Sequence, residues 1–342
     1  MHYLVTGHTG FKGAWLTLML AERGHRVSGI ALDPLPGSLY EIANLDQIVE
    51  ADHRVDIRDA EATRLAVEST NADVVLHMAA QPLVRDSYRD PRGTIETNVM
   101  GTLNVLEAVA ATDSVKANVV VTTDKVSRNT GRSEGYGEND ALGAADPYSS
   151  SKAMADILTQ SWVFSFDGPP TAIVRAGNVI GGGDVSPDRL LPDLLSAFRD
   201  GRTTEIRFPD AIRPWQHVLD CLAGYLALVD ALLDGNGAGE WNFGPGPESF
   251  VPVRELADEA VRLWGDGATW KHTGGDHPHE AAILALDAAK AERELGWTNK
   301  LRFPESVEWT VQWERQYRER GDALATTKEM IAKFEGLGAR VG

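Results

Sequence analysis

The sequence predicts an α/β protein built on a doubly wound parallel sheet, and three observations lead to this prediction. Short apolar segments alternate with helical periodicity through the first half of the chain. These segments lack the polar–apolar alternation of half-exposed strands, as expected when helices cover both faces of a sheet. A glycine-rich turn, Gly7-His-Thr-Gly10-Phe-Lys-Gly13, joins the first strand to the first helix.

The expected elements follow one another in regular order. Strands are predicted over residues 3–6, 26–32, 72–78, 119–123 and 172–175, and helices over 11–23, over 94–111 and from Pro147 onward. Gly24 stands where a left-handed residue ends the first helix. This succession is typical of a Rossmann-like domain, which we assign to residues 1–175.

After residue 176 the alternation becomes less regular, with a run of three glycines and several prolines. Helices are predicted over 190–200, 219–233, 252–263, 288–295 and 304–318, followed by an amphipathic helical tail. We expect residues 176–342 to form mainly a smaller α/β substrate domain, partly interleaved with the first. The segment of about 212–242 is predicted to return to the first domain.

Composition limits the classes of partner. Among 342 residues, 50 are acidic and 33 basic, which gives a net charge of −17 and argues against nucleic acid or a membrane surface as partner. Cys221 is the single cysteine, so no intrachain disulfide or usual structural zinc site is expected. No apolar run reaches the roughly 20 residues that span a bilayer. A strand from His2 leaves no room for a signal peptide, and we expect a cytoplasmic protein.

The glycine-rich turn predicts a dinucleotide site. Gly7, Gly10 and Gly13 allow a tight turn and a close backbone approach, so that a pyrophosphate rests on the helix N-terminus. Asp33 ends the second strand twenty residues after Gly13, where a carboxylate binds the adenosine ribose hydroxyls and favours NAD over NADP. The alternative is a structural turn with Asp33 as a helix cap. Asp56-Ile57 is expected at the adenine, or else as a solvated loop.

A second pattern, Tyr148-Ser-Ser-Ser-Lys152, predicts acid–base chemistry. Residues four apart share one helix face, so the Lys152 ammonium can approach the Tyr148 phenol and lower its pKa. Thr122-Thr123-Asp124-Lys125 ends a core strand, where open α/β sheets bind ligands. An exposed tyrosine with a surface lysine is the alternative for the isolated pair.

With Thr123, Tyr148 and Lys152 in this order, the chain resembles the extended short-chain dehydrogenase/reductase family. The resemblance implies that Tyr148 is the acid and base, that Lys152 orients the nicotinamide ribose and that Thr123 binds the reacting oxygen. Asn98, in the preceding helix, matches the structural asparagine of the family. Further residues implied at NAD are Thr9, Phe11, Ala79, Ala80, Gln81 and Thr122.

The pair Asp124-Lys125 separates reactions within this family. A 4-epimerase removes and returns a hydride at one carbon, whereas a 4,6-dehydratase must also take the C5 proton and expel the C6 hydroxyl. Asp124 suits protonation of the leaving hydroxyl. Lys125, if burial makes it neutral, suits removal of the C5 proton, which the C4 ketone acidifies. Many sugar-nucleotide dehydratases have Asp-Glu here, and lysine in the second place resembles the CDP-glucose 4,6-dehydratases.

This narrower resemblance covers almost everything from residue 3 to about 313. It implies a lyase (hydro-lyase) of deoxysugar biosynthesis that uses NAD to convert CDP-glucose to CDP-4-keto-6-deoxyglucose. The strings that carry it include Val5-Thr-Gly-His-Thr-Gly-Phe-Lys-Gly13, His77-Met-Ala-Ala-Gln-Pro-Leu-Val-Arg85, Val174-Arg-Ala-Gly-Asn-Val-Ile-Gly-Gly-Gly-Asp184 and Ile212-Arg-Pro-Trp-Gln-His-Val218.

One stretch departs from the resemblance. From Val126 to Tyr136 the chain lacks the aromatic residue and the tryptophan-containing loop of similar proteins. The loop is expected over the sugar, so the hexose and the base stay open, and a variable loop without consequence is the alternative. Other functions that remain open are another NDP-sugar dehydratase, a 4-epimerase and a non-catalytic NAD-binding regulator on the same fold.

A nucleotide-sugar substrate, with a CDP-hexose favoured, needs local cations because the chain is acidic. Guanidinium groups suit phosphates, but nearby aspartates make an ion-pair network the alternative for each arginine. No metal site is expected, since His277-Pro-His279-Glu280 has no standard zinc geometry. The residues assigned to the substrate are Arg85, Asn178, Arg189, Arg207, Arg213 and His279.

Two predicted helices are apolar beyond one face. They cover about residues 94–111 and 148–162. Similar proteins form dimers through such helices, so we expect a homodimer with a four-helix interface, with a tetramer as the alternative.

Overall fold

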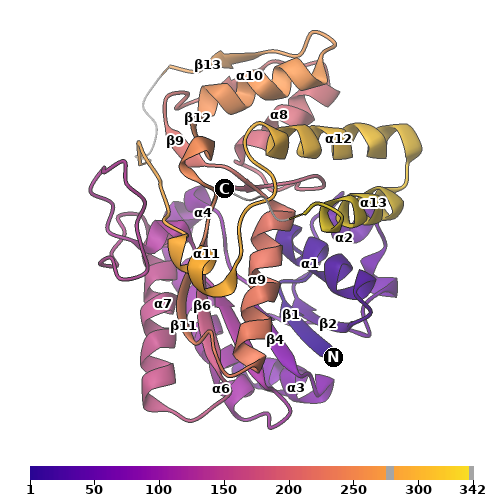
Figure 1. The fold of residues 1–342 in the computed structure, drawn as a ribbon. Helices are drawn as coiled ribbons and strands as arrows, with labels where there is room; N and C mark the ends of the chain where they lie inside the picture. The colour runs from indigo at the N-terminus through magenta and orange to yellow at the C-terminus, as the bar shows by residue number, and fades with distance from the viewer. Residues whose placement is uncertain (275–280, 339–342) are drawn as a thin grey trace.

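The computed structural model describes residues 1–274 and 281–338 and is built around one large sheet (Figure 1). Seven strands pair in the order β11-β6-β5-β4-β1-β2-β3, and every neighbouring pair is parallel. The predicted doubly wound, Rossmann-like class is therefore confirmed. The strands are β1 (His2–Thr6), β2 (Arg26–Ala31), β3 (Ala51–Arg54), β4 (Val74–His77), β5 (Ala117–Val121), β6 (Thr171–Ala176) and β11 (Gly239–Phe243).

Helices cover both faces of this sheet, which is why its central strands are buried throughout. On one face α3 (Ala60–Thr70), α6 (Gly101–Ala110) and α7 (Pro147–Ser165) pack in a row. On the other face α1 (Phe11–Glu22) packs beside α9 (Val218–Leu233). The helices α2 (Leu39–Ile42), α11 (Ala289–Leu295) and α13 (Ala323–Glu335) extend this second layer.

A smaller unit lies beyond the carboxyl ends of the strands, at the top of Figure 1. Its own core gathers Leu194, Leu256, Ala260, Val307 and Val311. Its helices are α8 (Leu190–Arg199), α10 (Val253–Trp264) and α12 (Glu305–Arg320). Its strand pairs are β7 (Val179–Ile180) with β10 (Gln216–His217), β8 (Thr204–Ile206) with β13 (Trp270–His272), and β9 (Ile212–Pro214) with β12 (Phe250–Pro252).

The chain crosses between the two units more than once. After β9 and β10 in the smaller unit, α9 packs on β5 and β6, and β11 extends the large sheet beside β6. The register pairs Trp241 with Val174 and Phe243 with Ala176. The carboxyl ends of the sheet strands and the smaller unit thus meet along one edge, where α/β proteins bind their ligands.

The long helix expected over residues 94–111 differs in detail from the prediction. It begins earlier, because Asp90 accepts a hydrogen bond from the Gly93 N–H (2.9 Å) and Pro91 occupies the first turn. Its middle is one wide turn, Glu96–Met100, between α5 (Pro91–Ile95) and α6. A short helix, α4 (Val84–Arg89), precedes it. Single tight turns lie at Leu45–Gln47, Asp124–Val126 and Pro247–Ser249.

Candidate active site

The proposed catalytic residues meet between the end of β5 and the start of α7. Thr123 and Asp124 lie just beyond the end of β5 and are each 5% exposed. Tyr148 and Lys152 lie one turn apart at the beginning of α7, and Lys152 is 4% exposed. Asp146 fixes where α7 starts, since its carboxylate accepts a hydrogen bond from the Ser149 N–H (2.9 Å).

The carboxylate of Asp124 is held by two neighbours, and a glycine leaves room for it. Thr123 Oγ donates to Asp124 Oδ1 (3.0 Å), and Asn178 Nδ2 lies 3.3 Å from Asp124 Oδ2. A Cβ atom on Gly177 would stand 2.0 Å from the Asp124 carboxyl carbon. Gly177 therefore leaves the space that this carboxylate occupies, and no larger residue fits there without displacing it.

Burial dominates the electrostatics of Tyr148 and Lys152. It raises the pKa of Tyr148 to about 12, although a hydrogen bond with Thr123 and the charge of Arg189 act in the opposite direction. It lowers the pKa of Lys152 to about 7, assisted by the charge of Lys12. In this structure Lys152 Nζ donates to the Val121 carbonyl (2.7 Å). The net lowering of the Tyr148 pKa expected from the spacing is wrong here, because burial of the phenol has the largest effect and the charges of Asp124 and Asp146 raise the pKa as well.

Lys125 stands on the same side as the phenol. Its Nζ lies 5.9 Å from the centroid of the Tyr148 ring, and the residue is half-buried. The short turn Asp124–Val126 orients it, with the Thr123 hydroxyl 3.5 Å from the Lys125 N–H. A carboxyl group, an amino group, a hydroxyl and a phenol thus lie within one small region of the protein.

The glycine-rich turn has the geometry of an anion site at a helix N-terminus. Gly10 precedes α1 without a side-chain cap, and the first turn of α1 contains no acidic residue. Gly7 has a φ of 76°, and a Cβ on Gly13 would lie 2.2 Å from the Gly7 carbonyl oxygen. Only glycine permits this turn, which leaves the N-terminus of α1 uncovered by side chains, as a site for the pyrophosphate of a dinucleotide requires.

Of the residues expected near the adenosine, some are free to contact a ligand and others are engaged within the protein. The Asp33 side chain is 91% exposed, with Arg54 Nε 4.0 Å away, so its carboxylate is open to a ligand. Thr9 Oγ donates to the Leu32 carbonyl (3.0 Å) and ties the turn to the end of β2. Asp56 is engaged by Arg58, which lowers the pKa of Asp56. Ile57 is 4% exposed and belongs to the hydrophobic core.

Asn98 braces the loop that follows β4. Its Oδ1 accepts from the Gln81 N–H (2.8 Å), and its Nδ2 donates to the Gln81 carbonyl (3.0 Å) and to Ser151 Oγ (2.8 Å). It is fully buried in the wide turn before α6. Asn98 therefore connects the segment Ala79-Ala80-Gln81 to α7. Both its amide oxygen and its amide nitrogen are hydrogen-bonded within the protein.

Arg85 and Arg189, two of the arginines expected at the substrate, lie next to carboxylates. Arg85 Nη1 donates to Asp188 Oδ1 (2.7 Å), and Arg189 Nη1 lies 3.4 Å from Asp184 Oδ2. Arg213 is 6% exposed, and its Nη1 donates to the Ile212 carbonyl (2.8 Å). The ion-pair network considered as the alternative is thus present. His279 lies outside the described residues.

Comparison with known proteins places the chain in a family. The model of the NAD dependent epimerase/dehydratase family matches residues 3–244. This chain belongs to that family. The match includes the glycine-rich turn and the residues from Thr123 to Lys152, and it confirms the predicted cofactor, NAD, and the resemblance on which that prediction rested.

Family members of known sequence and structure match over most of their length. A CDP-glucose 4,6-dehydratase of Salmonella typhimurium is 44% identical over 96% of this chain and 95% of its own. A dTDP-glucose 4,6-dehydratase of Escherichia coli K12 is 29% identical, covering 92% of both chains. The crystal structure of DesIV, a dTDP-glucose 4,6-dehydratase of Streptomyces venezuelae with NAD and TYD bound, is 26% identical with a TM-score of 0.80, over 93% of this chain and 98% of that one.

Sequence reasoning missed a buried ion pair that supports this family site. Asp156 of α7 is fully buried and accepts hydrogen bonds from Arg175 of β6 and from Thr122 Oγ (3.1 Å). The sequence contained a signal for this pair, since Arg175 is a charged residue in an otherwise apolar predicted strand and needs a buried partner of opposite charge. Gly177 was also missed, although it lies two residues after Arg175 in the string quoted for the resemblance.

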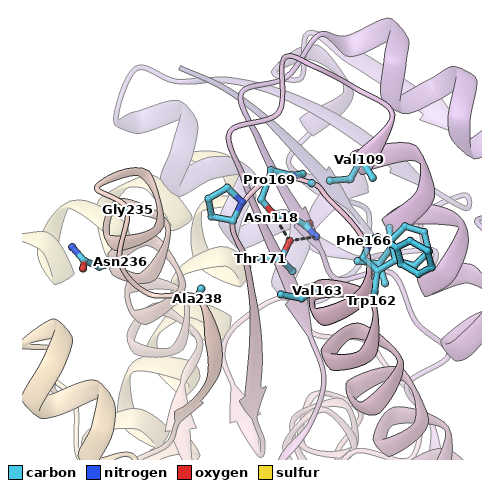
Figure 2. A pocket seen from close by; sticks show the side chains of 14 residues that line it. Val109, Asn118, Trp162, Val163, Phe166, Pro169, Thr171, Gly235, Asn236 and Ala238 are labelled. Atoms are coloured by element: carbon cyan, nitrogen blue, oxygen red, sulfur yellow. Dashed lines mark hydrogen bonds between the residues drawn. The ribbon is translucent and has the colours of Figure 1, made fainter.

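A pocket of ≈ 300 Å³ lies at the opposite end of the sheet (Figure 2). Trp162, Phe166 and Pro169 line it, and Asn118 and Thr171 mark the starts of β5 and β6. It is thus separate from the catalytic residues at the carboxyl ends. Among the described residues, no three His, Cys, Asp or Glu side chains gather as metal ligands, and no helix there is long and apolar enough to cross a membrane.

Proposed function

We propose that this protein is an NAD-dependent CDP-glucose 4,6-dehydratase, which forms CDP-4-keto-6-deoxyglucose, an intermediate for deoxysugars. The observation that carries the proposal is the Asp124-Lys125 pair beside Thr123 and Tyr148. A 4-epimerase has no step that needs this additional acid and base. The choice of cytidine is supported by the 44% identical relative of Salmonella typhimurium, named for CDP-glucose.

Oxidation at C4 begins with the phenol. Thr123 holds the C4 oxygen by a hydrogen bond, and Tyr148 accepts the C4 hydroxyl proton as general base. Lys152 is assigned to the cofactor ribose, as the family resemblance implies. Bound NAD supplies the hydride acceptor for C4 and the hydride donor for C6.

Elimination of water uses the second pair. The C4 ketone acidifies the C5 hydrogen, and Lys125 removes that proton as a base. Asp124 gives a proton to the C6 hydroxyl, which leaves as water. Asp124 is 5% exposed, so its carboxyl group is shielded from solvent where it would meet the C6 hydroxyl. Lys125 then returns a proton to C5 of the reduced sugar.

Each part of the chain has a distinct binding role in this proposal. Residues 1–175 hold NAD through the glycine-rich turn, Asp33 and the Asn98-braced loop, and the segment 212–242 returns to this part. Residues 176–342 mainly hold the nucleotide sugar. Arg85, Arg189, Arg207 and Arg213 are proposed to face its diphosphate and sugar, and Asn178 to orient Asp124.

The experiment is a comparison of nucleotide sugars. We expect the purified protein with NAD to convert CDP-glucose to a 4-keto-6-deoxy product faster than dTDP-glucose or UDP-glucose. Formation of CDP-galactose instead would identify a 4-epimerase. Binding of NAD and CDP-glucose without any turnover would contradict the proposal and indicate a regulator.

We also propose a homodimer that is located in the cytoplasm. Ile95, Met100, Met154 and Ile157 expose 40%, 47%, 39% and 53% of their surface on α5, the turn after it and α7, which pack together. A second copy would cover this apolar face. Light scattering should give a dimer for the wild type and a monomer for Ile157→Glu, with Leu65→Glu on α3 as control.

The proposed location in the cytoplasm is supported by Cys221. Its thiol is buried and free, which fits a reducing compartment.

A further inference from the structure

One carboxylate lies between two arginines that come from different parts of the chain. Asp188 Oδ1 is 2.7 Å from Arg85 Nη1 and 3.9 Å from Arg207 Nη1. Arg85 belongs to α4, which follows strand β4 of the large sheet, whereas Asp188 precedes α8 and Arg207 follows β8 in the smaller unit. This contact therefore joins the two units across the edge where ligands bind.

The backbone at Asp188 is held in an uncommon conformation. Its φ is 59°, in the left-handed region, which residues with a Cβ rarely adopt, although aspartate tolerates it better than most. The loop thus directs this carboxylate toward the guanidinium groups at a conformational cost. Such strain in a loop is typical of a position with a role beyond packing.

The three side chains remain accessible to solvent. Arg85, Asp188 and Arg207 expose 36%, 29% and 25% of their side-chain surface. Ion pairs at this level of exposure contribute little to stability, so a ligand can replace one partner. A diphosphate has two negative charges and the oxygen geometry that guanidinium groups bind best.

We propose that Asp188 is a built-in competitor for the substrate diphosphate: its carboxylate occupies the Arg85–Arg207 pair and leaves it when a nucleoside diphosphate sugar binds. This inference rests on the proposed function. Because Asp188 is part of the same molecule, it acts at a high effective concentration, which a small free anion must overcome. A nucleotide sugar overcomes it with the added contacts of its base and hexose. Asp188 thereby selects against inorganic phosphate and pyrophosphate.

The test measures the binding of inorganic pyrophosphate and of CDP by calorimetry. Asp188→Asn keeps the size of the side chain and removes its charge, and we expect at least tenfold tighter binding of pyrophosphate, with a smaller gain for CDP. Asp200→Asn is the matched control, because it makes the same change in net charge. Asp200 pairs with Arg202 at 2.6 Å at the exposed end of α8. The affinities of this variant should equal those of the wild type.

A double substitution tests the assigned partner. Adding Arg85→Met to Asp188→Asn should remove most of the gain, because the second guanidinium alone binds pyrophosphate poorly. Unchanged pyrophosphate binding by Asp188→Asn would overturn the inference, and weaker binding would overturn it by showing that Asp188 orients the arginines. An equal gain in Asp200→Asn would overturn it as well. Pyrophosphate binding needs no turnover, so a protein inactive on CDP-glucose with the expected gain would contradict only the proposed function.

Discussion

Asp156 and Arg175 form a doubly hydrogen-bonded ion pair that is closed to solvent. Arg175 Nε lies 2.8 Å from Asp156 Oδ2 and Arg175 Nη2 lies 2.9 Å from Asp156 Oδ1, with both side chains at most 1% exposed. Thr122 donates to the same carboxylate. The pair therefore connects β6, the end of β5 and α7, and it fixes the distance between Thr123 and the helix that carries Tyr148 and Lys152.

Removal of one partner should destabilise the protein strongly. In Asp156→Ala the guanidinium of Arg175 stays buried without its counter-charge, and we expect a loss of about 3–5 kcal/mol in the free energy of unfolding. Urea unfolding followed by circular dichroism measures it. Glu329→Ala breaks the exposed pair with Arg320 and should cost less than about 1 kcal/mol. Equal losses in the two variants would show that the buried pair is not structurally important.

Gly177→Ala should impair catalysis without unfolding the protein. The new Cβ would stand 2.0–2.2 Å from the carboxylate atoms of Asp124, so this side chain must move away. A displacement of about 1 Å in a catalytic group lowers turnover roughly 100-fold. In the control Gly168→Ala, the new Cβ meets Ala110 Cβ at 3.7 Å, an ordinary contact. Full activity of Gly177→Ala would mean that the Asp124 position is unimportant.

Asp124→Asn should separate oxidation from water loss. The amide keeps the shape of the side chain but cannot protonate the C6 hydroxyl, and we expect elimination to slow by about 10²–10⁴. Oxidation at C4 should continue, so that reduced cofactor accumulates in rapid-mixing absorbance measurements. If elimination proceeds at the wild-type rate, Asp124 is not the acid.

Lys152 should make stability depend on pH. Its pKa is about 7 in the folded protein and near 10.5 when exposed, so between these values the unfolded chain binds one more proton. Stability of the wild type should therefore rise with pH in this range, by up to about 1.4 kcal/mol per pH unit, relative to Lys152→Met. Urea titrations of the cofactor-free proteins at several pH values measure the difference. A difference independent of pH would show that Lys152 keeps its ordinary pKa.

The fold was predictable because its signals are local. The glycine-rich turn and the apolar strands identify the parallel sheet, and the family match confirms the NAD site. The tyrosine and the lysine of α7 are four residues apart, so one helix suffices to bring them together. The roles of the individual site residues, the division into two domains and the dimer remain proposals.

The properties that the sequence did not reveal depend on contacts between distant residues. Arg175 and Asp156 meet only when β6 and α7 pack together, and Asp188 reaches Arg85 across 103 residues. The pKa of Tyr148 follows from its burial in the folded protein, which the four-residue spacing does not report. The start of the helix at Pro91, by contrast, could have been predicted locally, because Asp90 and Pro91 are typical residues for a helix N-terminus.

The most direct test of the proposed reaction is an NMR measurement in deuterated water. The protein is incubated with NAD and CDP-glucose, and the sugar signals are followed. We expect a 4-keto-6-deoxy sugar with one deuterium at C5 and a hydrogen transferred from C4 to C6. A product without deuterium at C5, or with its C6 hydroxyl retained, would contradict the assigned elimination through Asp124 and Lys125.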